Sequence, residues 1–266
     1  MYRRILSSEM GLTLIELLIT VVLTGVVATA IFNVYLSSSQ TYTKQLAETE
    51  VQQNLRAGLE SVIQDLRMAG FKGRGGATTG ITNAGNNSIS FTMDRNEDGD
   101  ILDADEDLTY SLFASGGIMN LVRRPGAAAA DMTMAVAENI DALGFAYSYD
   151  INGDGILDVN ASGNTIRAVI GANGNWFNLD ANDDGVIDLA DDTDTNGTLN
   201  ATDTGIPADL EDIRVVTIWM LARTSRSDNN FNSTTSFTIG DTVVPPAAGF
   251  RRRILTTQVY CRNMGV

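Results

Sequence analysis

The chain of 266 residues contains no histidine and one cysteine, and 33 acidic residues outnumber 18 basic ones to give a net charge of −15. Without histidine, the chain lacks the commonest general base and the usual ligand of catalytic zinc, and one cysteine cannot form an intramolecular disulfide. The acidic balance argues against nucleic acid binding, because negative charge repels phosphates. The length predicts one globular head with an extension.

A basic segment at the start of the sequence is followed by a long apolar one. Arg3 and Arg4 precede Gly11, and residues 12–36 carry a single charge, Glu16. About 20 apolar residues can cross a membrane as a helix, and no Ala-x-Ala-like site ends this stretch as it would end a cleaved secretory signal. We therefore expect residues 12–36 to be a retained transmembrane helix. A carboxylate at bilayer depth costs roughly 2.5–3.5 kcal/mol on insertion scales, so the presence of Glu16 needs a reason, and the simplest one is a tolerated glutamate near the end of the span.

Six residues at the start of the apolar segment resemble the type IV prepilin cleavage motif: Gly11-Leu12-Thr13-Leu14-Ile15-Glu16. In that family a prepilin peptidase cuts after the glycine and methylates the new terminal amine. The resemblance implies a leader of residues 1–11, cleavage between Gly11 and Leu12, and pairing of Glu16 with the terminal amine of a neighbouring subunit. Leu12 replaces the usual phenylalanine, and both are apolar.

The same resemblance implies where the protein is found and what it contacts. It would cross the inner membrane once with a periplasmic head, and it would later lie in a pilus at the cell surface. Its partners would be the prepilin peptidase, the membrane, and other pilins or minor pilins that contact the N-terminal helix.

The helix is expected to continue beyond the membrane. One face is apolar at helical spacing, at Leu55, Leu59, Val62 and Leu66. Gly70 is a natural stop, so the sequence predicts one helix over residues 12–69. Its first half would lie in the membrane or the filament, and its second half would pack on the head.

Residues 70–266 are expected to form a β-rich head. Apolar residues in alternating or continuous runs predict strands at 88–93, 108–112, 118–123, 143–149, 213–223 and 250–261, and a short helix at 132–140. The first three strands should form an antiparallel meander that covers the apolar face of the long helix. The predicted fold class is therefore α+β and pilin-like.

Two further stretches look like the PilW type of minor pilin: VIQDLRMAGF at 62–71 and RRRILTTQVYCRN at 251–263. This resemblance implies a minor pilin that takes part in the assembly or initiation of a type IV pilus. From its residues alone, the arginine run 251–253 is interpreted as a solvated strand edge. Cys261 is interpreted as a small apolar strand residue.

Four acidic loops share the pattern of EF-hand-type calcium loops, with oxygen ligands at positions one, three and five, glycine at six and an aliphatic residue at eight. A backbone carbonyl at position seven and a later carboxylate would complete each site. Loop one would use Asp94, Asn96, Asp98, Asp100 and Asp105. Loop two would use Asp150, Asn152, Asp154, Ile156 and Asp158. Loop three would use Asp180, Asn182, Asp184, Val186 and Asp191. Loop four would use Asp192, Asp194, Asn196, Thr198 and Asp203.

The repeated pattern predicts up to four Ca²⁺ ions. Solvated acidic turns explain any one loop, but four matches in register favour cation binding. Calcium is favoured over magnesium because many flexible oxygen donors suit the larger ion. Loops three and four adjoin directly and resemble thrombospondin type 3 calcium loops. Loops two to four fall in an insert of residues 150–212 between two strands, and bound ions would order so long a connection.

Three functions fit these features. A PilW-like minor pilin with a calcium-stabilised head is the first, a pseudopilin of a type II secretion system is the second, and a calcium-dependent adhesin at a filament tip is the third. Acidic residues also support metal-assisted or glycosidic hydrolysis. We expect no enzyme, because the calcium pattern accounts for the acidic clusters.

Overall fold

The computed structural model describes residues 13–74, 76–126, 134–160, 163–170, 176–178, 181, 190, 193, 195, 205–206, 209–240 and 242–265. The chain divides after Ala47 into two compact units. A single helix, α1 (Leu14–Leu66), forms the described part of the first unit and the beginning of the second.

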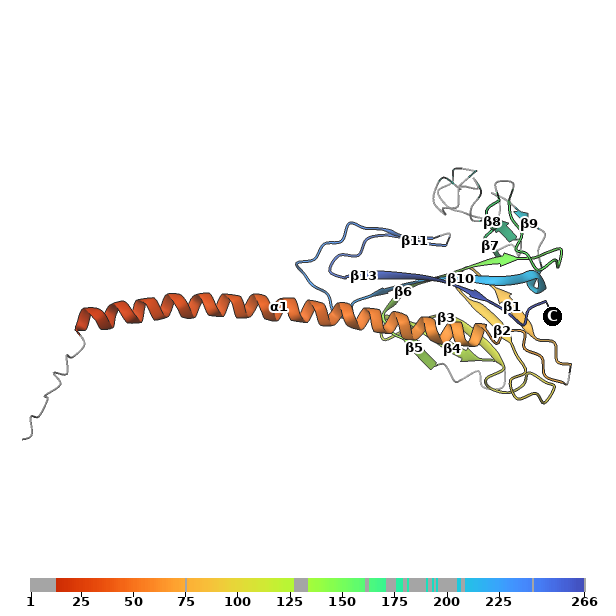
Figure 1. The fold of residues 1–266 in the computed structure, drawn as a ribbon, viewed down its shortest axis with the longest axis horizontal. Coiled ribbons are helices and arrows are strands. Elements are labelled where there is room, and N and C mark those ends of the chain that lie inside the picture. Colours follow the sequence, from red (N-terminus) through yellow and green to blue (C-terminus); the bar gives the residue numbers. More distant parts are fainter. Residues whose placement is uncertain are drawn as a thin grey trace, which may run out of the picture. The chain divides into compact units, whose positions relative to one another are not determined.

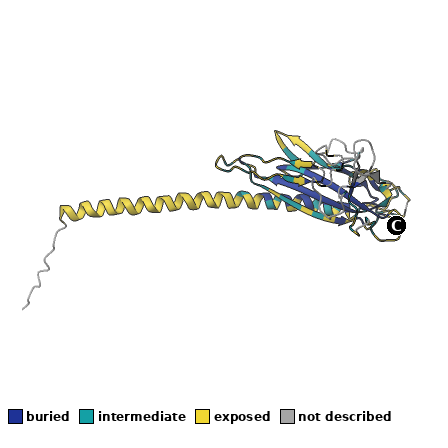
Figure 2. Cartoon of the chain, turned by 90° about the horizontal axis from the view of Figure 1, so that it is seen from above, coloured by how far each residue is buried: buried dark blue, intermediate teal, exposed yellow. Residues whose placement is uncertain are grey.

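In the first unit, the apolar side chains of α1 are exposed on all sides of the helix (Figure 2). Large apolar residues from Leu14 to Leu46 face solvent, and α1 is long and apolar enough at this end to cross a membrane by length and composition. A helix that is apolar all round needs an apolar environment. This half of α1 is therefore compatible with a membrane anchor.

In the second unit, α1 buries one stripe of side chains. The predicted stripe is confirmed, and Val51 and Gly58 extend it. The helix ends at Leu66, three residues before the predicted end, and the chain turns through Gly70 at a φ of +79°. The left-handed region favours glycine, so Gly70 marks the stop as expected.

The first sheet of the head is a five-stranded antiparallel meander (Figure 1). Its strands follow chain order: β1 (Gly80–Ala84), β2 (Ile89–Thr92), β3 (Asp107–Ser115), β4 (Ile118–Pro125) and β5 (Met134–Ala137). The pairing of β2 with β3 and of β3 with β4 confirms the predicted meander. Loop one therefore connects two paired strands.

The second sheet has six strands in the order β13-β10-β6-β7-β8-β9. Its strands are β6 (Ile140–Tyr149), β7 (Ala168–Ile170), β8 (Trp176–Asn178), β9 (Gly205–Ile206), β10 (Ile213–Arg223) and β13 (Arg252–Tyr260). A 3-10 helix, η3 (Leu210–Asp212), leads into β10. A two-stranded hairpin, β11 (Phe237–Ile239) and β12 (Thr242–Val244), completes the head.

One continuous core joins α1 to both large sheets. It contains Leu55 and Val62 of α1, Phe91 and Tyr110 of the first sheet, and Phe145 of the second. Aromatic and aliphatic side chains thus exclude water between the helix and the strands, which is the dominant stabilising effect in a domain of this kind. A smaller apolar cluster lies where β11 and β12 meet β6 and β10.

The helix predicted at residues 132–140 is wrong. Met134–Ala137 form strand β5, which pairs with β4, and Asn139 adopts a φ of +57° before β6 begins at Ile140. The positive φ and the pairing with β4 are incompatible with a helix here. Residues 132 and 133 lie outside the described residues.

Candidate functional site

The cleavage motif lies at the start of α1. Gly11 and Leu12 are outside the described residues, whereas Glu16 lies in the first turn. The Glu16 carboxylate accepts hydrogen bonds from the Thr13 backbone N–H at 2.9 Å and from its hydroxyl at 2.8 Å, while the Glu16 N–H donates to the Thr13 hydroxyl at 3.3 Å. This reciprocal pair is a capping box, so Glu16 has a local role in starting the helix.

In loop one, the side chains at the predicted ligand positions form hydrogen bonds with backbone N–H groups of the loop. The oxygens at positions one, three and five each accept a backbone N–H: Asp94 from Gly99 at 3.1 Å, Asn96 from Asp98 at 2.9 Å, and Asp98 from Asp100 at 3.1 Å. Glu97 and Gly99, at positions four and six, have positive φ values of 62° and 95°. The chain therefore coils around the side-chain oxygens.

Loop two repeats this geometry. The same three bonds join Gly155 to Asp150 at 2.9 Å, Asp154 to Asn152 at 3.0 Å, and Ile156 to Asp154 at 2.8 Å. Positive φ values recur at positions four and six, here Gly153 and Gly155. The shared sequence pattern thus produces a shared backbone at two distant places in the chain.

The structure gathers three carboxylates at loop one. One oxygen from each of Asp98, Asp100 and Glu106 lies within 4.8 Å of the other two. Asp98 was predicted as a side-chain ligand and Asp100 only through its backbone carbonyl, whereas Glu106, at position thirteen, was not predicted. Strand alternation was the signal that could have found it, because Glu106, Leu108 and Tyr110 are all buried at a spacing of two.

The remaining predicted ligand of loop one points elsewhere. Asp105 forms an ion pair with Arg123 at 2.9 Å, and Arg123 also binds Asp65 of α1 at 2.7 Å. The hydroxyl of Tyr110 donates to Asp65 at 2.7 Å. Burial raises the pKa of the Tyr110 hydroxyl. For Arg123, burial lowers the pKa of the guanidinium, but the hydrogen bonds to Asp65 and Asp105 outweigh this effect and raise the pKa overall.

The predicted ligands of loops three and four lie outside the described residues. They are Asp180, Asn182, Asp184, Val186, Asp191, Asp192, Asp194, Asn196, Thr198 and Asp203. Thr195, at position four of loop four, is described and has a positive φ of 57°, like the residues at position four of loops one and two.

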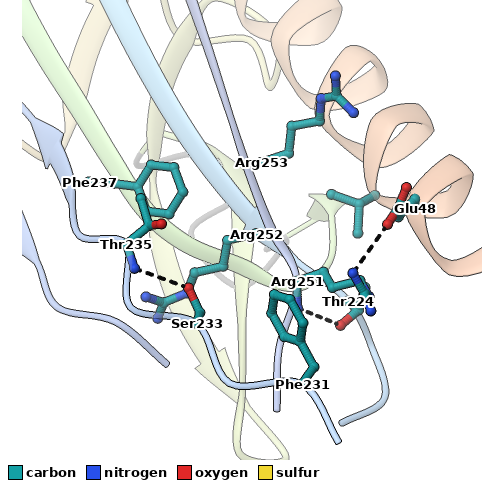
Figure 3. A pocket seen from close by; sticks show the side chains of 10 residues that line it. Glu48, Thr224, Phe231, Ser233, Thr235, Phe237, Arg251, Arg252 and Arg253 are labelled. Atoms are coloured by element: carbon teal, nitrogen blue, oxygen red, sulfur yellow. Dashed lines mark hydrogen bonds and ion pairs between the residues drawn. The ribbon is translucent and has the colours of Figure 1, made fainter. Parts of the chain in front are cut away.

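A surface pocket of 290 Å³ lies in the head beside the second part of α1. Its lining includes Val51, Phe231 and the arginine run 251–253. Figure 3 shows the ion pair between Arg251 and Glu48, whose atoms are 3.6 Å apart, and the Arg251 guanidinium also lies over the Phe231 ring at 4.2 Å. The pocket is thus lined by apolar side chains and by arginines.

The expectation that all three arginines are solvated holds only for Arg253. Arg252 binds Asp141 at 2.6 Å, and Arg223 binds the same carboxylate at 3.2 Å. Arg252 and Asp141 are both about nine-tenths buried, which makes this a charge cluster of the interior. Strand β13 does lie at the edge of its sheet, as predicted.

Comparisons with known proteins relate the head to one family. The family model described as type IV pilus-assembly protein W matches residues 109–263. Among solved structures, a type IV-like pilin from Thermus thermophilus matches with a TM-score of 0.35 and 10% sequence identity, covering 81% of this chain and 98% of that chain. No curated protein matches the sequence. The residues matched by the family run from β3 through β13 and include parts of both large sheets.

Proposed function

Because the chain belongs to the type IV pilus-assembly protein W family, we propose that it is a minor pilin that takes part in the assembly or initiation of a type IV pilus. The observation that supports this best is the exposed apolar half of α1, which is long and apolar enough to cross a membrane. Such a surface requires lipid or other apolar helices around it. Both environments are available to a pilin, first in the membrane and then in the filament.

The processing of the N-terminus is part of this proposal. A prepilin peptidase removes residues 1–11 by cutting between Gly11 and Leu12. The new terminal amine of one subunit then pairs with Glu16 of a neighbour, because a carboxylate among apolar helices is costly unless it is neutralised. The protein crosses the inner membrane once before assembly, with its head in the periplasm, and afterwards lies in a surface pilus with other pilins.

Calcium is the proposed cofactor, with up to four ions in the head. The support is the shared geometry of loops one and two, together with the same ligand pattern in loops three and four. Carboxylate and amide oxygens are the ligands that Ca²⁺ prefers. The ions would offset repulsion within the acidic loops and stiffen the head, which has a structural and not an enzymatic role.

Deletion of the gene tests the filament function. We expect loss of surface pili with unchanged release of exoproteins, because a type II pseudopilin would give the opposite result. Wild-type protein should restore pili, and Glu16→Ala should not. Glu60→Ala is the matched control, since Glu60 is an exposed acid on the same helix and should restore pili fully. Normal piliation in the deletion strain, or full rescue by Glu16→Ala, would contradict the proposal.

A further inference from the structure

Loop one contains two buried carboxylates that no cation of the described head neutralises. Asp94 is fully buried and Glu106 is 1% exposed. One oxygen of each, Asp94 Oδ1 and Glu106 Oε2, has no hydrogen-bond partner among the described residues, and neither side chain forms an ion pair with them. A buried carboxylate oxygen without a partner is disfavoured in the interior. The site therefore calls for a positive charge beside these oxygens.

One of these two carboxylates, Glu106, belongs to a group of acidic side chains that could bind one ion. Glu106 is one of the three residues whose oxygens gather within 4.8 Å, and the other two, Asp98 and Asp100, are exposed. Ligand oxygens around one Ca²⁺ lie about 2.3–2.6 Å from the ion, so two of them are at most about 5 Å apart. The spacing at loop one meets this limit. Among the described residues, loop two does not gather three carboxylates in this way.

Asp105 and Glu106 are neighbours with different environments. Asp105 is already neutralised by Arg123, at 2.9 Å, and its side chain is 59% exposed. Glu106 faces the buried side, and its Oε1 accepts the Arg95 N–H at 2.9 Å and the Asn96 N–H at 3.2 Å. One oxygen of Glu106, Oε1, thus binds the backbone at positions two and three of the loop. The other oxygen, Oε2, has no partner among the described residues.

Loop two places a carboxylate in the equivalent position. The N–H at position two of loop one, Arg95, donates to Glu106, and the N–H at position two of loop two, Ile151, donates to Asp158 at 2.8 Å. The two carboxylates come from different positions of the sequence pattern, thirteen and nine. Each accepts a hydrogen bond from the N–H at position two of its own loop, so Glu106 and Asp158 have equivalent places in the two loops.

We propose that Glu106, and not Asp105, completes a Ca²⁺ site with Asp94, Asp98 and Asp100, and that the bound ion holds the segment after α1 against the first sheet; this rests on the calcium binding proposed above. The Asp94 N–H donates to the Phe71 carbonyl at 2.9 Å, and the Gly70 N–H donates to the Thr92 carbonyl at 3.0 Å. Gly73 lies so close to Asp94 that a side chain at position 73 would collide with the carboxylate. Residues 70–73 are therefore in direct contact with loop one and the strand before it, so an ion that orders loop one should also order these residues.

Hydrogen exchange of the full chain in detergent, followed by mass spectrometry during a Ca²⁺ titration, tests this site peptide by peptide. We expect Ca²⁺ to protect residues 70–74 and 94–106 in the wild type. Glu106→Gln should raise the Ca²⁺ concentration for half-maximal protection by at least about tenfold, because it removes a charged ligand. Asp105→Asn is the matched control at the neighbouring residue, and it should change the Ca²⁺ concentration for half-maximal protection by less than about threefold.

Asp98→Asn keeps the test valid if Glu106→Gln does not fold, because Asp98 is exposed. It should weaken protection as much as Glu106→Gln does. Loss of protection in Asp105→Asn with normal protection in the other two variants would overturn the proposed ligand set. Protection of the insert 150–212 alone would overturn the site at loop one and leave calcium binding intact. Protection nowhere in the wild type would overturn the calcium proposal itself.

Discussion

Arg123 connects two acidic side chains that come from different parts of the head. Its Nε atom is 2.7 Å from Asp65 on α1, and an Nη atom is 2.9 Å from Asp105 beside loop one. Tyr110 completes the group by donating to Asp65. Because Arg123 and Asp65 have side-chain exposures of only 12% and 18%, neither charge is well solvated. This cluster therefore fixes the position of the end of α1 on β3 and β4.

Replacement of Arg123 by alanine should destabilise the head. It leaves Asp65 partly buried with Tyr110 as a remaining donor, and we expect the free energy of unfolding to fall by about 2 kcal/mol, below the 3–5 kcal/mol of a fully buried pair because water still reaches both side chains. Denaturant unfolding of the full chain in detergent measures this change. Arg253→Ala is the control, with an expected change within about 0.5 kcal/mol. Equal losses in both variants would contradict the role of Arg123.

Cys261 should make the stability of the head depend on alkaline pH. Burial raises the pKa of the Cys261 thiol from its ordinary 9.0 to about 12, although Arg214 opposes the rise. Above pH 9 the unfolded chain loses this proton while the folded chain keeps it, so the thiol favours unfolding increasingly until about pH 12. Below pH 9 it has no effect, since both states are protonated.

Unfolding measured from pH 8 to pH 10.5 in wild type and Cys261→Ala checks this sign. The wild type should lose stability more steeply than the variant above pH 9, by at most about 1.4 kcal/mol per pH unit. The native thiol should also resist Ellman's reagent at pH 8. Parallel pH profiles, or rapid labelling of the folded protein, would show that the thiol is not buried as the structure has it.

Among the elements, α1 and three strands approach one another closely at Gly58. A Cβ atom on this residue would lie 2.9 Å from Ala137 Cβ and 3.2 Å from Leu121 Cδ2, and 3.3 Å from the sulfur of Met220. These neighbours belong to β5, β4 and β10. Glycine is retained inside this helix, despite its poor helix propensity, because no side chain fits there.

A leucine at position 58 should therefore separate the helix from the sheets. We expect Gly58→Leu to lower the free energy of unfolding by about 3 kcal/mol, at the upper end of the cost of overpacking a core. Ala57→Leu is the matched control, because residue 57 is exposed on the same turn and should tolerate leucine. Thermal unfolding of the two variants side by side provides the measurement. Equal melting temperatures would mean that α1 does not pack here as described.

Local signals predicted some elements well and failed for others. The apolar stripe of α1 was predicted because it repeats the helical period over several turns, and the strand Ile213–Arg223 because it is a long, nearly continuous apolar run. Strand β5 was mistaken for a helix because four apolar residues have no distinctive period, and its pairing with β4 decides its state. The short strands β7, β8 and β9 were missed for the same reason, since each depends on its partner strand.

The candidate site was predictable to a similar extent. The ligand pattern predicted where loops one and two turn, because oxygens and glycines at fixed positions dictate a local backbone. It could not distinguish Asp105 from Glu106, since these neighbours directly precede β3 and only the fold decides which of the two is buried. Asp105 is instead held by Arg123, a residue from another strand that no local pattern reveals.

At the scale of the whole molecule, the net charge of −15 destabilises the folded chain, because the acidic side chains repel one another. We expect Ca²⁺ to raise the melting temperature of the full chain in detergent, because an ion that binds only the folded state adds about 2.7 kcal/mol per site at a concentration of 100 times its Kd. A chelator should in turn expose the insert 150–212 to protease. Mg²⁺ at the same concentration is the control and should have a smaller effect. No response to Ca²⁺ or chelator would contradict the calcium proposal.

The apolar half of α1 is the feature on which the proposed filament function depends. Its side chains are exposed in the isolated chain, and the family to which the chain belongs is named for type IV pilus assembly. Release of this helix from a basic leader would create the amine that Glu16 requires. In the proposed function, membrane anchoring, cleavage and assembly would all depend on one short segment at the start of α1.

The decisive measurement is the N-terminal sequence and intact mass of the protein recovered from sheared filaments of its own host. We predict a chain that begins at Leu12 with a methylated amine and that is present in the filament fraction. A protein that still begins at Met1 in the cell, or that is cleaved but never found with filaments, would contradict its assignment as a filament subunit.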